Sequence, residues 1–276
     1  MKEFKDKVAV ITGASSGIGF GIAERCAQEE MKVVLAGINL DNLVQAEKAL
    51  EHLGAESLCV QTDVRKRDDI EALAKVTIEK YGAVHLLVNN AGLGAGLSIW
   101  ESTWSDWEWV MGVNLWGVIY GVKVFVPIML EQDEPCHIVN TSSIAGLLPY
   151  HPSAPYQVTK HAVVALTESL QYSLMQKEAK IRASVLCPGY VKTRILAAER
   201  NRPVELENEP VEHSPEEIAI FQNLQESIDA GISPQDVAEI LFRALKEERL
   251  YINTHPEYNP SVQERMNDIM QSLDQK

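Results

Sequence analysis

A tyrosine and a lysine four residues apart give this sequence its clearest chemical potential, in Tyr156-Gln157-Val158-Thr159-Lys160. In a helix their side chains would lie on one face, one turn apart. A phenol loses its proton near pH ~10, and a neighbouring ammonium stabilises the phenolate and lowers that pKa. Ser143, thirteen positions before Tyr156 and just after an apolar run, adds a second hydroxyl. We therefore predict a cradle of two hydroxyls for a carbonyl oxygen, with Tyr156 as general acid or base.

The Tyr-x-x-x-Lys spacing is also common on surface helices, so the elements that would position it matter. Short β-branched runs alternate with helical segments along the chain. The expected strands are 7–12, 32–36, 57–61, 84–88, 136–140, 181–186 and 249–253, and the expected helices include 20–30, 40–53, 68–81, 104–130 and 156–177. This alternation predicts a Rossmann-type α/β fold, a doubly wound parallel sheet of about seven strands in three α/β/α layers.

The 276 residues are expected to form one domain, 1–276, without a linker or repeat. Residues 194–230 interrupt the alternation with prolines and acidic residues. An insertion after the carboxyl end of a strand predicts a lid over the site. After the last strand we expect only a polar tail from Thr254 onwards.

The first strand leads into a glycine-rich turn with Gly13, Gly17 and Gly19. Between a strand and a helix, such a turn presents backbone N–H groups and the helix dipole to a pyrophosphate. The same turn matches the G-x-S-x-G elbow of hydrolases, with Ser15 as the nucleophile. That alternative is disfavoured for two reasons. The elbow belongs on a central strand later in the chain, and no Asp and His obviously complete a catalytic triad. His213 and His255, which lie in the expected lid and tail, do not supply one.

Further motifs follow in a fixed order. They are Thr12-Gly13-x-x-x-Gly17-Ile18-Gly19, Asp63-Val64, Asn89-Asn90-Ala91-Gly92, Asn114, Ser143, Tyr156-x-x-x-Lys160 and Pro188-Gly189-Tyr190-Val191-Lys192-Thr193. In this order and spacing the chain resembles the short-chain dehydrogenase/reductase family in its single-domain form. The resemblance covers about two-thirds of the chain, from Lys7 to Thr193.

The resemblance implies a role for each matching residue. Cofactor binding falls to Gly13, Ser16, Ile18 and Gly19 at the pyrophosphate, Asp63 and Val64 at the adenine, Asn90 at a ribose, and Val191 and Thr193 at the nicotinamide carboxamide. In catalysis, Ser143 would orient the substrate oxygen and Tyr156 would pass the proton. Lys160 would bond the nicotinamide ribose and lower the tyrosine pKa, and Asn114 would hold a water that continues the proton path. Asn89 is expected to tie strands together instead.

The chain departs from the family at the end of the second strand, Ala36-Gly37-Ile38-Asn39. Relatives that use NAD often have an acid there, and phosphate-selective ones an arginine. Neither is present, and Ser15 and Asn39 are able to hydrogen-bond a phosphate or a hydroxyl. We predict a slight preference for NADP(H) over NAD(H).

Composition narrows the function classes. A formal net charge of −14 without a Lys/Arg run argues against nucleic-acid binding. Four scattered cysteines without a C-x-x-C pair, and a polar N-terminus without a signal peptide, predict a cytoplasmic protein with no metal site. The apolar stretch 109–130 is expected to be a buried helix and not a membrane span. With the Tyr156 helix it is predicted to form the interface of a homodimer or homotetramer.

These observations predict an enzyme that moves hydride reversibly between a nicotinamide and a carbonyl or secondary alcohol, with NAD or NADP as the acceptor. The residues expected at the substrate are mostly apolar or aromatic: Gly94, Leu97, Leu147, Tyr150, His151 and Tyr190, where His151 is expected near solvent. These residues predict an apolar small-molecule substrate.

The near-helical spacing of Trp100, Trp104 and Trp107 favours packing or a subunit contact over ligand stacking. A non-catalytic dinucleotide sensor of the same fold is the alternative.

Overall fold

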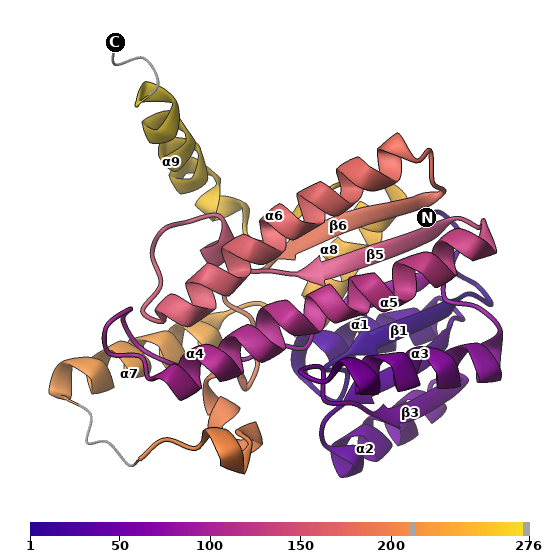
Figure 1. The fold of residues 1–276 in the computed structure, drawn as a ribbon, viewed down its shortest axis with the longest axis horizontal. Coiled ribbons are helices and arrows are strands. Elements are labelled where there is room, and N and C mark those ends of the chain that lie inside the picture. Colours follow the sequence, from indigo (N-terminus) through magenta and orange to yellow (C-terminus); the bar gives the residue numbers. More distant parts are fainter. Residues whose placement is uncertain (210–213, 273–276) are drawn as a thin grey trace.

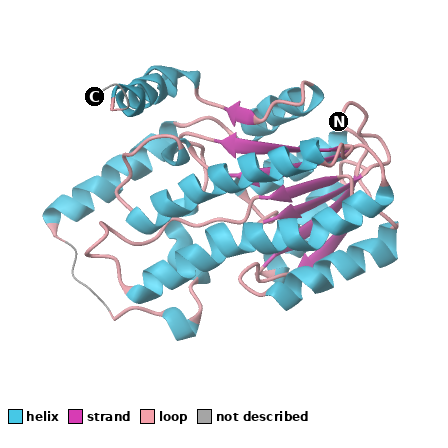
Figure 2. Ribbon diagram, turned by 45° about the horizontal axis from the view of Figure 1, so that its top comes forward, coloured by secondary structure: helices cyan, strands magenta, loops and turns pink. Residues whose placement is uncertain are grey.

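The central element is a parallel sheet of seven strands in the order β3-β2-β1-β4-β5-β6-β7. The computed structural model describes residues 1–209 and 214–272. The strands are β1 (Val8–Thr12), β2 (Lys32–Gly37), β3 (Ser57–Gln61), β4 (Leu86–Asn89), β5 (Cys136–Thr141), β6 (Ile181–Cys187) and β7 (Tyr251–Asn253). Figure 2 shows them all pointing the same way between layers of helices. The predicted doubly wound sheet is confirmed, with strand ends shifted by at most two residues.

Helices cover both faces of the sheet, and side chains of β1 alternate between them. Ala9 and Ile11 pack towards α1 (Gly17–Gln28), α2 (Leu40–Glu51) and α8 (Pro234–Lys246). Val8 and Val10 pack towards the other layer. That layer contains α3 (Arg67–Tyr81), α5 (Gly117–Gln132) and α6 (Ala154–Gln176) (Figure 1). Burial on both faces explains why these strands are β-branched and show no polar alternation.

The long helix predicted over 104–130 is interrupted. It consists of α4 (Trp104–Met111), a π-helical turn η1 (Gly112–Trp116) and α5. Within the described residues, Trp104–Gln132 is the one helix whose length and composition would allow a membrane crossing, and 33% of its most apolar window is buried inside the chain. The π-helical turn contains Asn114, whose amide bonds a neighbouring loop, and such turns often occur at functional sites.

Residues 194–209 and 214–230 lie at the carboxyl end of the sheet, beside α4 (Figure 1). They contain η3 (Ile195–Asn201), η4 (Val204–Leu206) and α7 (Pro215–Ala230). The start of α7 is a capping box, since Ser214 Oγ accepts from Glu217 N and the Glu217 side chain accepts from Ser214 N. This confirms the helix start that the sequence indicates at Ser214-Pro215.

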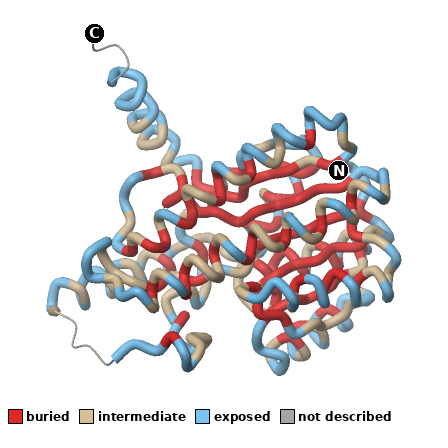
Figure 3. Tube along the Cα trace, in the orientation of Figure 1, coloured by how far each residue is buried: buried red, intermediate tan, exposed pale blue. Residues whose placement is uncertain are grey.

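The segment after Thr254 is polar, as expected, but it also contains a helix that the sequence reasoning did not predict. After a short turn, η5 (Pro256–Tyr258), the chain forms α9 (Asn259–Gln271), which projects from the body and is largely exposed (Figure 3). Arg265 Nη1 donates to the carbonyl oxygen of Leu147, 3.1 Å away, and joins this helix to the body. Its Gln, Glu, Arg and Met residues are good helix formers, so polar composition alone was a poor guide.

Candidate active site

A cavity of about 480 Å³ opens at the carboxyl ends of the central strands. β1 lies between β2 and β4 in the sheet, so the chain order reverses beside it. A doubly wound sheet binds ligands at such a switch point. The wall includes the β1–α1 turn and the segments that follow β3, β4, β5 and β6. The residues predicted for cofactor and substrate are therefore brought to one place.

The glycine-rich turn has the backbone that its residue types predict. Gly13 and Gly17 have φ values of +64° and +57°, which favour glycine. A Cβ on Gly19 would lie 2.3 Å from the carbonyl oxygen of Gly13, so no larger residue fits beneath the turn. Gly19 itself is not part of the cavity wall, whereas Ser15, Ser16 and Ile18 are.

Helix α1 begins at this turn with its first N–H groups available. Ser16, its N-cap, makes no side-chain capping hydrogen bond, and the first turn contains no acidic residue. Uncapped N–H groups and the positive end of the helix dipole together favour an anion. The turn therefore fits the pyrophosphate of a dinucleotide.

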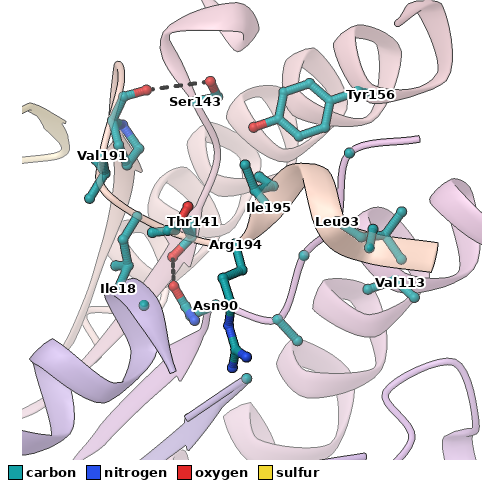
Figure 4. Close-up of a pocket in the computed structure, with 18 of the residues that line it drawn as sticks. Ile18, Asn90, Leu93, Val113, Thr141, Ser143, Tyr156, Val191, Arg194 and Ile195 are labelled. Atoms are coloured by element: carbon teal, nitrogen blue, oxygen red, sulfur yellow. Dashed lines mark hydrogen bonds between the residues drawn. The ribbon is translucent and has the colours of Figure 1, made fainter. Parts of the chain in front are cut away.

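Asn90 is fixed between β1 and β5. Its backbone N donates to Thr12 Oγ1 at 2.9 Å, and its Nδ2 donates to the Thr12 carbonyl at 3.1 Å. Thr141 Oγ1 donates to Asn90 Oδ1 at 3.4 Å (Figure 4). A rigid amide is thereby presented beside the glycine-rich turn, as a ribose contact requires.

Asn89 faces away from the cavity. Its Nδ2 donates to Asn140 Oδ1 at 2.9 Å, and Asn140 Nδ2 donates to Thr167 Oγ1 at 3.0 Å. These two hydrogen bonds between side chains connect β4, β5 and α6. The predicted role of Asn89, which is to tie strands together, is confirmed.

At the adenosine end, Asp63 is paired with a residue that the sequence reasoning missed. Arg65 Nη2 lies 2.7 Å from Asp63 Oδ2, and Arg65 also reaches Glu205. Asp63, Val64 and Asn39 all line the cavity. Asn39 Oδ1 accepts from Asn42 N at 2.9 Å as the N-cap of α2, which leaves its amide NH₂ to face a ligand.

Tyr156 and Lys160 lie on one face of α6, as their spacing predicts. Lys160 Nζ is 5.3 Å from the centre of the Tyr156 ring and donates to the Thr141 carbonyl at 3.0 Å. Burial raises the pKa of Tyr156, and the Ser143 hydroxyl opposes this shift only in part. Burial lowers the pKa of Lys160 to about 8. The spacing of the two residues indicated the neighbouring charge. It did not indicate the desolvation, which is the largest influence on the pKa of each group.

Ser143 lies at the end of β5, where the chain turns into η2 (Ile144–Gly146). Its Oγ accepts from Ala145 N at 3.1 Å and donates to the Pro188 carbonyl at 3.3 Å. Figure 4 shows the Tyr156 hydroxyl and Ser143 facing the same space. The cradle of two hydroxyls that the sequence predicts is therefore present in the geometry.

His151 is a residue whose position the sequence reasoning misjudged. Its ring stacks on Tyr156, with centroids 4.5 Å apart and planes inclined by 28°. Ser153 N donates to His151 Nδ1 at 3.0 Å, and burial lowers the pKa of the ring, which favours the neutral form. It lies in a loop, as expected, but it is half-buried and its ring covers one face of the phenol.

Asn114 is buried and does not line the cavity. Its Oδ1 accepts from Leu93 N and its Nδ2 donates to the Leu93 carbonyl, both at 2.9 Å. The side chain thus clamps the loop after β4. Whether it also helps to hold a water for proton transfer stays a prediction.

The substrate side of the cavity is mostly apolar. Its additional lining residues are Leu93, Trp109, Val113, Ile195, Leu196, Ala198, Leu224 and Ile228. Of the predicted contacts, Gly94, Tyr150, His151 and Tyr190 line it, whereas Leu97 and Leu147 do not. Five of these eight additional residues lie within residues 194–230. An apolar pattern within that segment would have indicated them.

The tryptophans behave differently from one another. Trp109 is buried in the wall, and the Arg202 guanidinium lies 4.3 Å from its ring centre. Trp100 and Trp104 are 81% and 88% exposed, so they do not pack within the chain. Their predicted subunit contact remains open.

The sequence matches a known protein family over most of its length. The family model described as short chain dehydrogenase matches residues 7–203. The chain belongs to the short-chain dehydrogenase/reductase family. A solved member from Burkholderia phymatum, in complex with NAD, is 46% identical, has a TM-score of 0.95, and aligns over 99% of this chain and 97% of its own.

Two curated relatives of this short-chain dehydrogenase/reductase span nearly its whole length. A "CLA biosynthesis dehydrogenase/reductase" of Lactiplantibacillus plantarum is 37% identical over 98% of this chain and 95% of its own. A "C alpha-dehydrogenase" of Sphingobium sp. (strain NBRC 103272 / SYK-6) is 32% identical over 99% of this chain and 88% of its own. The protein is therefore an oxidoreductase that uses a nicotinamide dinucleotide.

The geometry gives no support to a Ser15 hydrolase. Within the described residues no histidine hydrogen bonds to Ser15, and the histidine in the cavity wall, His151, bonds Ser153. His255 bonds Gly189 and Tyr190 instead. His213 lies outside the described residues.

Proposed function

We propose that this enzyme reversibly reduces an apolar ketone to a secondary alcohol. The convergence of Tyr156, Lys160 and Ser143 on one cavity, beside an uncapped helix N-terminus, supports this proposal. The dinucleotide, when bound, supplies or accepts the hydride. The remaining chemistry is proton transfer to or from the substrate oxygen, for which the chain has its own groups.

In the reducing direction, Ser143 Oγ donates a hydrogen bond to the carbonyl oxygen, and Tyr156 Oη gives it a proton as the negative charge develops. The phenolate that remains is stabilised by the Lys160 ammonium. Because burial raises the pKa of Tyr156, the reaction depends on Lys160 being charged, and its own pKa of about 8 places that requirement near neutrality. In the oxidising direction the same phenolate is the base.

The proposed substrate is apolar near the reacting carbon. Trp109, Leu93, Ile195 and Leu196 surround the space next to Tyr156, and burying apolar substrate surface against them would supply most of the binding free energy. Residues 194–230 would act as its lid, in the same single domain as the sheet.

For the dinucleotide we propose NAD(H) as the tighter binder, which reverses the slight preference predicted from the sequence. A 2′-phosphate needs an unpaired cation, as phosphate-selective relatives provide. Within the described residues, Arg65 is the one cation in the cavity wall next to Asp63, and it is already paired with Asp63 and Glu205. Asn39 and Asn42 offer only neutral amides. Initial rates with NADH and NADPH over a panel of ketones test this and the substrate class together.

The central test replaces Tyr156 by Phe, with Tyr172→Phe as the matched control. Tyr172 lies on the exposed side of α6. Removing a general acid costs about 10²–10⁴-fold in rate. We expect Y156F to lose turnover by this amount while the Kd of NAD+ stays within twofold, and Y172F to be unchanged. Near-normal turnover of Y156F would refute the mechanism; cofactor binding without turnover in the unmodified protein would favour the sensor.

We further propose a homodimer or homotetramer in the cytoplasm. The support is an apolar outer surface on the π-helical turn η1 and on α6, where Trp116 and Met175 are exposed. The four cysteines are free thiols, which suits a reducing compartment. Sedimentation at micromolar concentration tests the assembly, and a monomer would contradict it.

A further inference from the structure

Two arginines without carboxylate partners lie together at one wall of the cavity. Arg194 directly precedes η3 and Arg200 lies within it, and both line the cavity. Within the described residues neither forms an ion pair, whereas Arg202, two positions on, is paired with Asp106 and Glu199. In a chain with 39 acidic and 25 basic residues, two adjacent unpaired guanidiniums are unexpected. Both residues are exposed, so solvent screens their mutual repulsion, but their guanidiniums leave positive charge at this wall that an anion would neutralise.

The local structure brings the Arg200 guanidinium to the backbone of Arg194. Arg200 Nη1 donates to the Arg194 carbonyl at 3.0 Å and also to the Ala197 carbonyl. Burial and the charge of Arg194 both lower the pKa of Arg200. Within the described residues, the Arg194 guanidinium and the Nε and Nη2 of Arg200 have no hydrogen-bond partner. Several donors are therefore available to a ligand.

The start of η3 lies against the glycine-rich turn. A Cβ on Gly17 would lie 3.1 Å from Cγ2 of Thr193, the residue immediately before Arg194. Figure 4 shows the Arg194 side chain running beside Asn90, in the half of the cavity that contains Ile18, and away from Tyr156. The arginines thus belong to the dinucleotide half of the cavity and not to the reacting centre.

We propose that Arg194 and Arg200 form the second wall of a pyrophosphate site, opposite the uncapped N-terminus of α1. The inference rests on the use of a nicotinamide dinucleotide. Backbone N–H groups of α1 bind the pyrophosphate from one side, and the guanidiniums bind it from the other with charge-assisted hydrogen bonds. The bound pyrophosphate would then be contacted by both α1 and η3.

The test measures the binding of three ligands by titration calorimetry: NAD+, ADP-ribose and adenosine. ADP-ribose retains the pyrophosphate, and adenosine has no phosphate. The variants are Arg194→Gln, Arg200→Gln and Arg194→Lys, with Arg249→Gln as the control. Arg249 is an exposed arginine just before β7, at the amino ends of the strands and remote from the cavity.

We expect R194Q to weaken NAD+ and ADP-ribose by about 10–100-fold, the value of a hydrogen bond to a charged group. R200Q should weaken both by a smaller factor, and R194K should recover part of the loss. Adenosine binding should be unchanged in every variant, and R249Q should bind all three ligands as the unmodified protein does.

Three results would overturn the inference. Equal weakening of NAD+ and adenosine would mean general damage to the cavity. A much larger loss for NADP+ than for NAD+ would move the arginines to the 2′-phosphate. Unchanged cofactor Kd values with a raised KM for carboxylate-bearing ketones would assign them to the substrate. Failure of the unmodified protein to bind any dinucleotide would instead refute the proposed function itself.

Discussion

Arg202 is the side chain whose replacement should affect the substrate wall most, although it touches no substrate. It is 4% exposed, and its Nη2 lies 2.6 Å from Asp106 Oδ1, whose side chain is 8% exposed. Arg202 also pairs with Glu199 and lies over the ring of Trp109. Asn208 Nδ2 donates to the same Asp106 oxygen at 2.9 Å. The ion pair between Arg202 and Asp106 therefore holds residues 199–208 on α4, and the Arg202 side chain packs against the indole of Trp109.

Arg202→Met keeps the length and apolar stem of the side chain but removes its charge. Asp106 would then be a buried carboxylate with only neutral donors, and breaking such a pair from one side costs about 3–5 kcal/mol. We take the lower value, about 3 kcal/mol, because the other partner, Glu199, is 67% exposed. At roughly 2–3 °C per kcal/mol for a chain of this size, Tm should fall by roughly 6–9 °C. KM for an apolar ketone should rise because Trp109 is no longer held.

The pH dependence separates the ion pair from simple packing. Burial alone would raise the pKa of Asp106, but hydrogen bonds from Arg202, Asn208 and Thr103 outweigh it and hold the pKa below its usual value. A carboxyl whose folded pKa is depressed contributes stability above its unfolded pKa of about 3.9 and loses it as the pH falls through the folded value. The gap in Tm between the two proteins should therefore be full at pH 7 and close below about pH 4.

The assay is thermal unfolding by circular dichroism at several pH values, with Asp106→Asn and the double variant completing a cycle. If the pair is coupled as described, the double variant is more stable than the sum of the two single losses predicts. A Tm of R202M within 1 °C of the unmodified protein at pH 7, or strict additivity in the cycle, would refute the reasoning.

Four further predictions concern single groups. Lys160→Met removes a charge 5.3 Å from the centre of the Tyr156 ring. Its attraction for the phenolate is worth about 3 kcal/mol at an effective dielectric constant of ~20. Without it the pKa of Tyr156 rises, so the pH profile of kcat/KM for alcohol oxidation should move up by about 2 units. His151→Ala should lower kcat by about 2–10-fold, the worth of an aromatic stack, whereas His151→Phe should not; equal losses would mean that stacking is irrelevant. Burial lowers the pKa of His137 to about 3, so the folded protein keeps this ring neutral while the unfolded chain protonates it below pH ~6.5. The free energy of unfolding should therefore fall by up to about 1.4 kcal/mol per pH unit below that value. In His137→Gln, the free energies of unfolding in urea at pH 7 and pH 5 should differ by less than in the unmodified protein. Desolvation raises the pKa of all four cysteine thiols, so none should react with a disulfide reagent at pH 8 until the protein unfolds.

The sheet could be predicted because its strands are buried on both faces. Runs such as Val8–Thr12 and Cys136–Thr141 are apolar without alternation, and turn residues or helical segments separate them. The glycine-rich turn and the Tyr156–Lys160 pair could also be predicted, since each depends on residues within a few positions of one another. Local spacing is enough when the chemistry is local.

The rest depends on contacts between distant parts of the chain. The pair of Arg202 and Asp106 spans 96 positions, and no periodicity indicates it. The stack of His151 on Tyr156 depends on the path of one loop. The raised pKa of Tyr156 reflects its depth in the cavity, which spacing does not give. Helix α9 has no buried residue, so its sequence lacks the apolar periodicity that would predict a helix.

The π-helical turn at Gly112–Trp116 lets one continuous helix serve two surfaces. Each residue advances an α-helix by about 100°, so an extra residue in a single turn rotates everything after it by about that angle. The part before the turn places Trp109 in the cavity, and the turn itself places Asn114 on Leu93. The part after the turn is phased to place Phe125 and Met129 on the sheet. Removal of one residue would restore a regular helix, but the two halves would then no longer both face their partners.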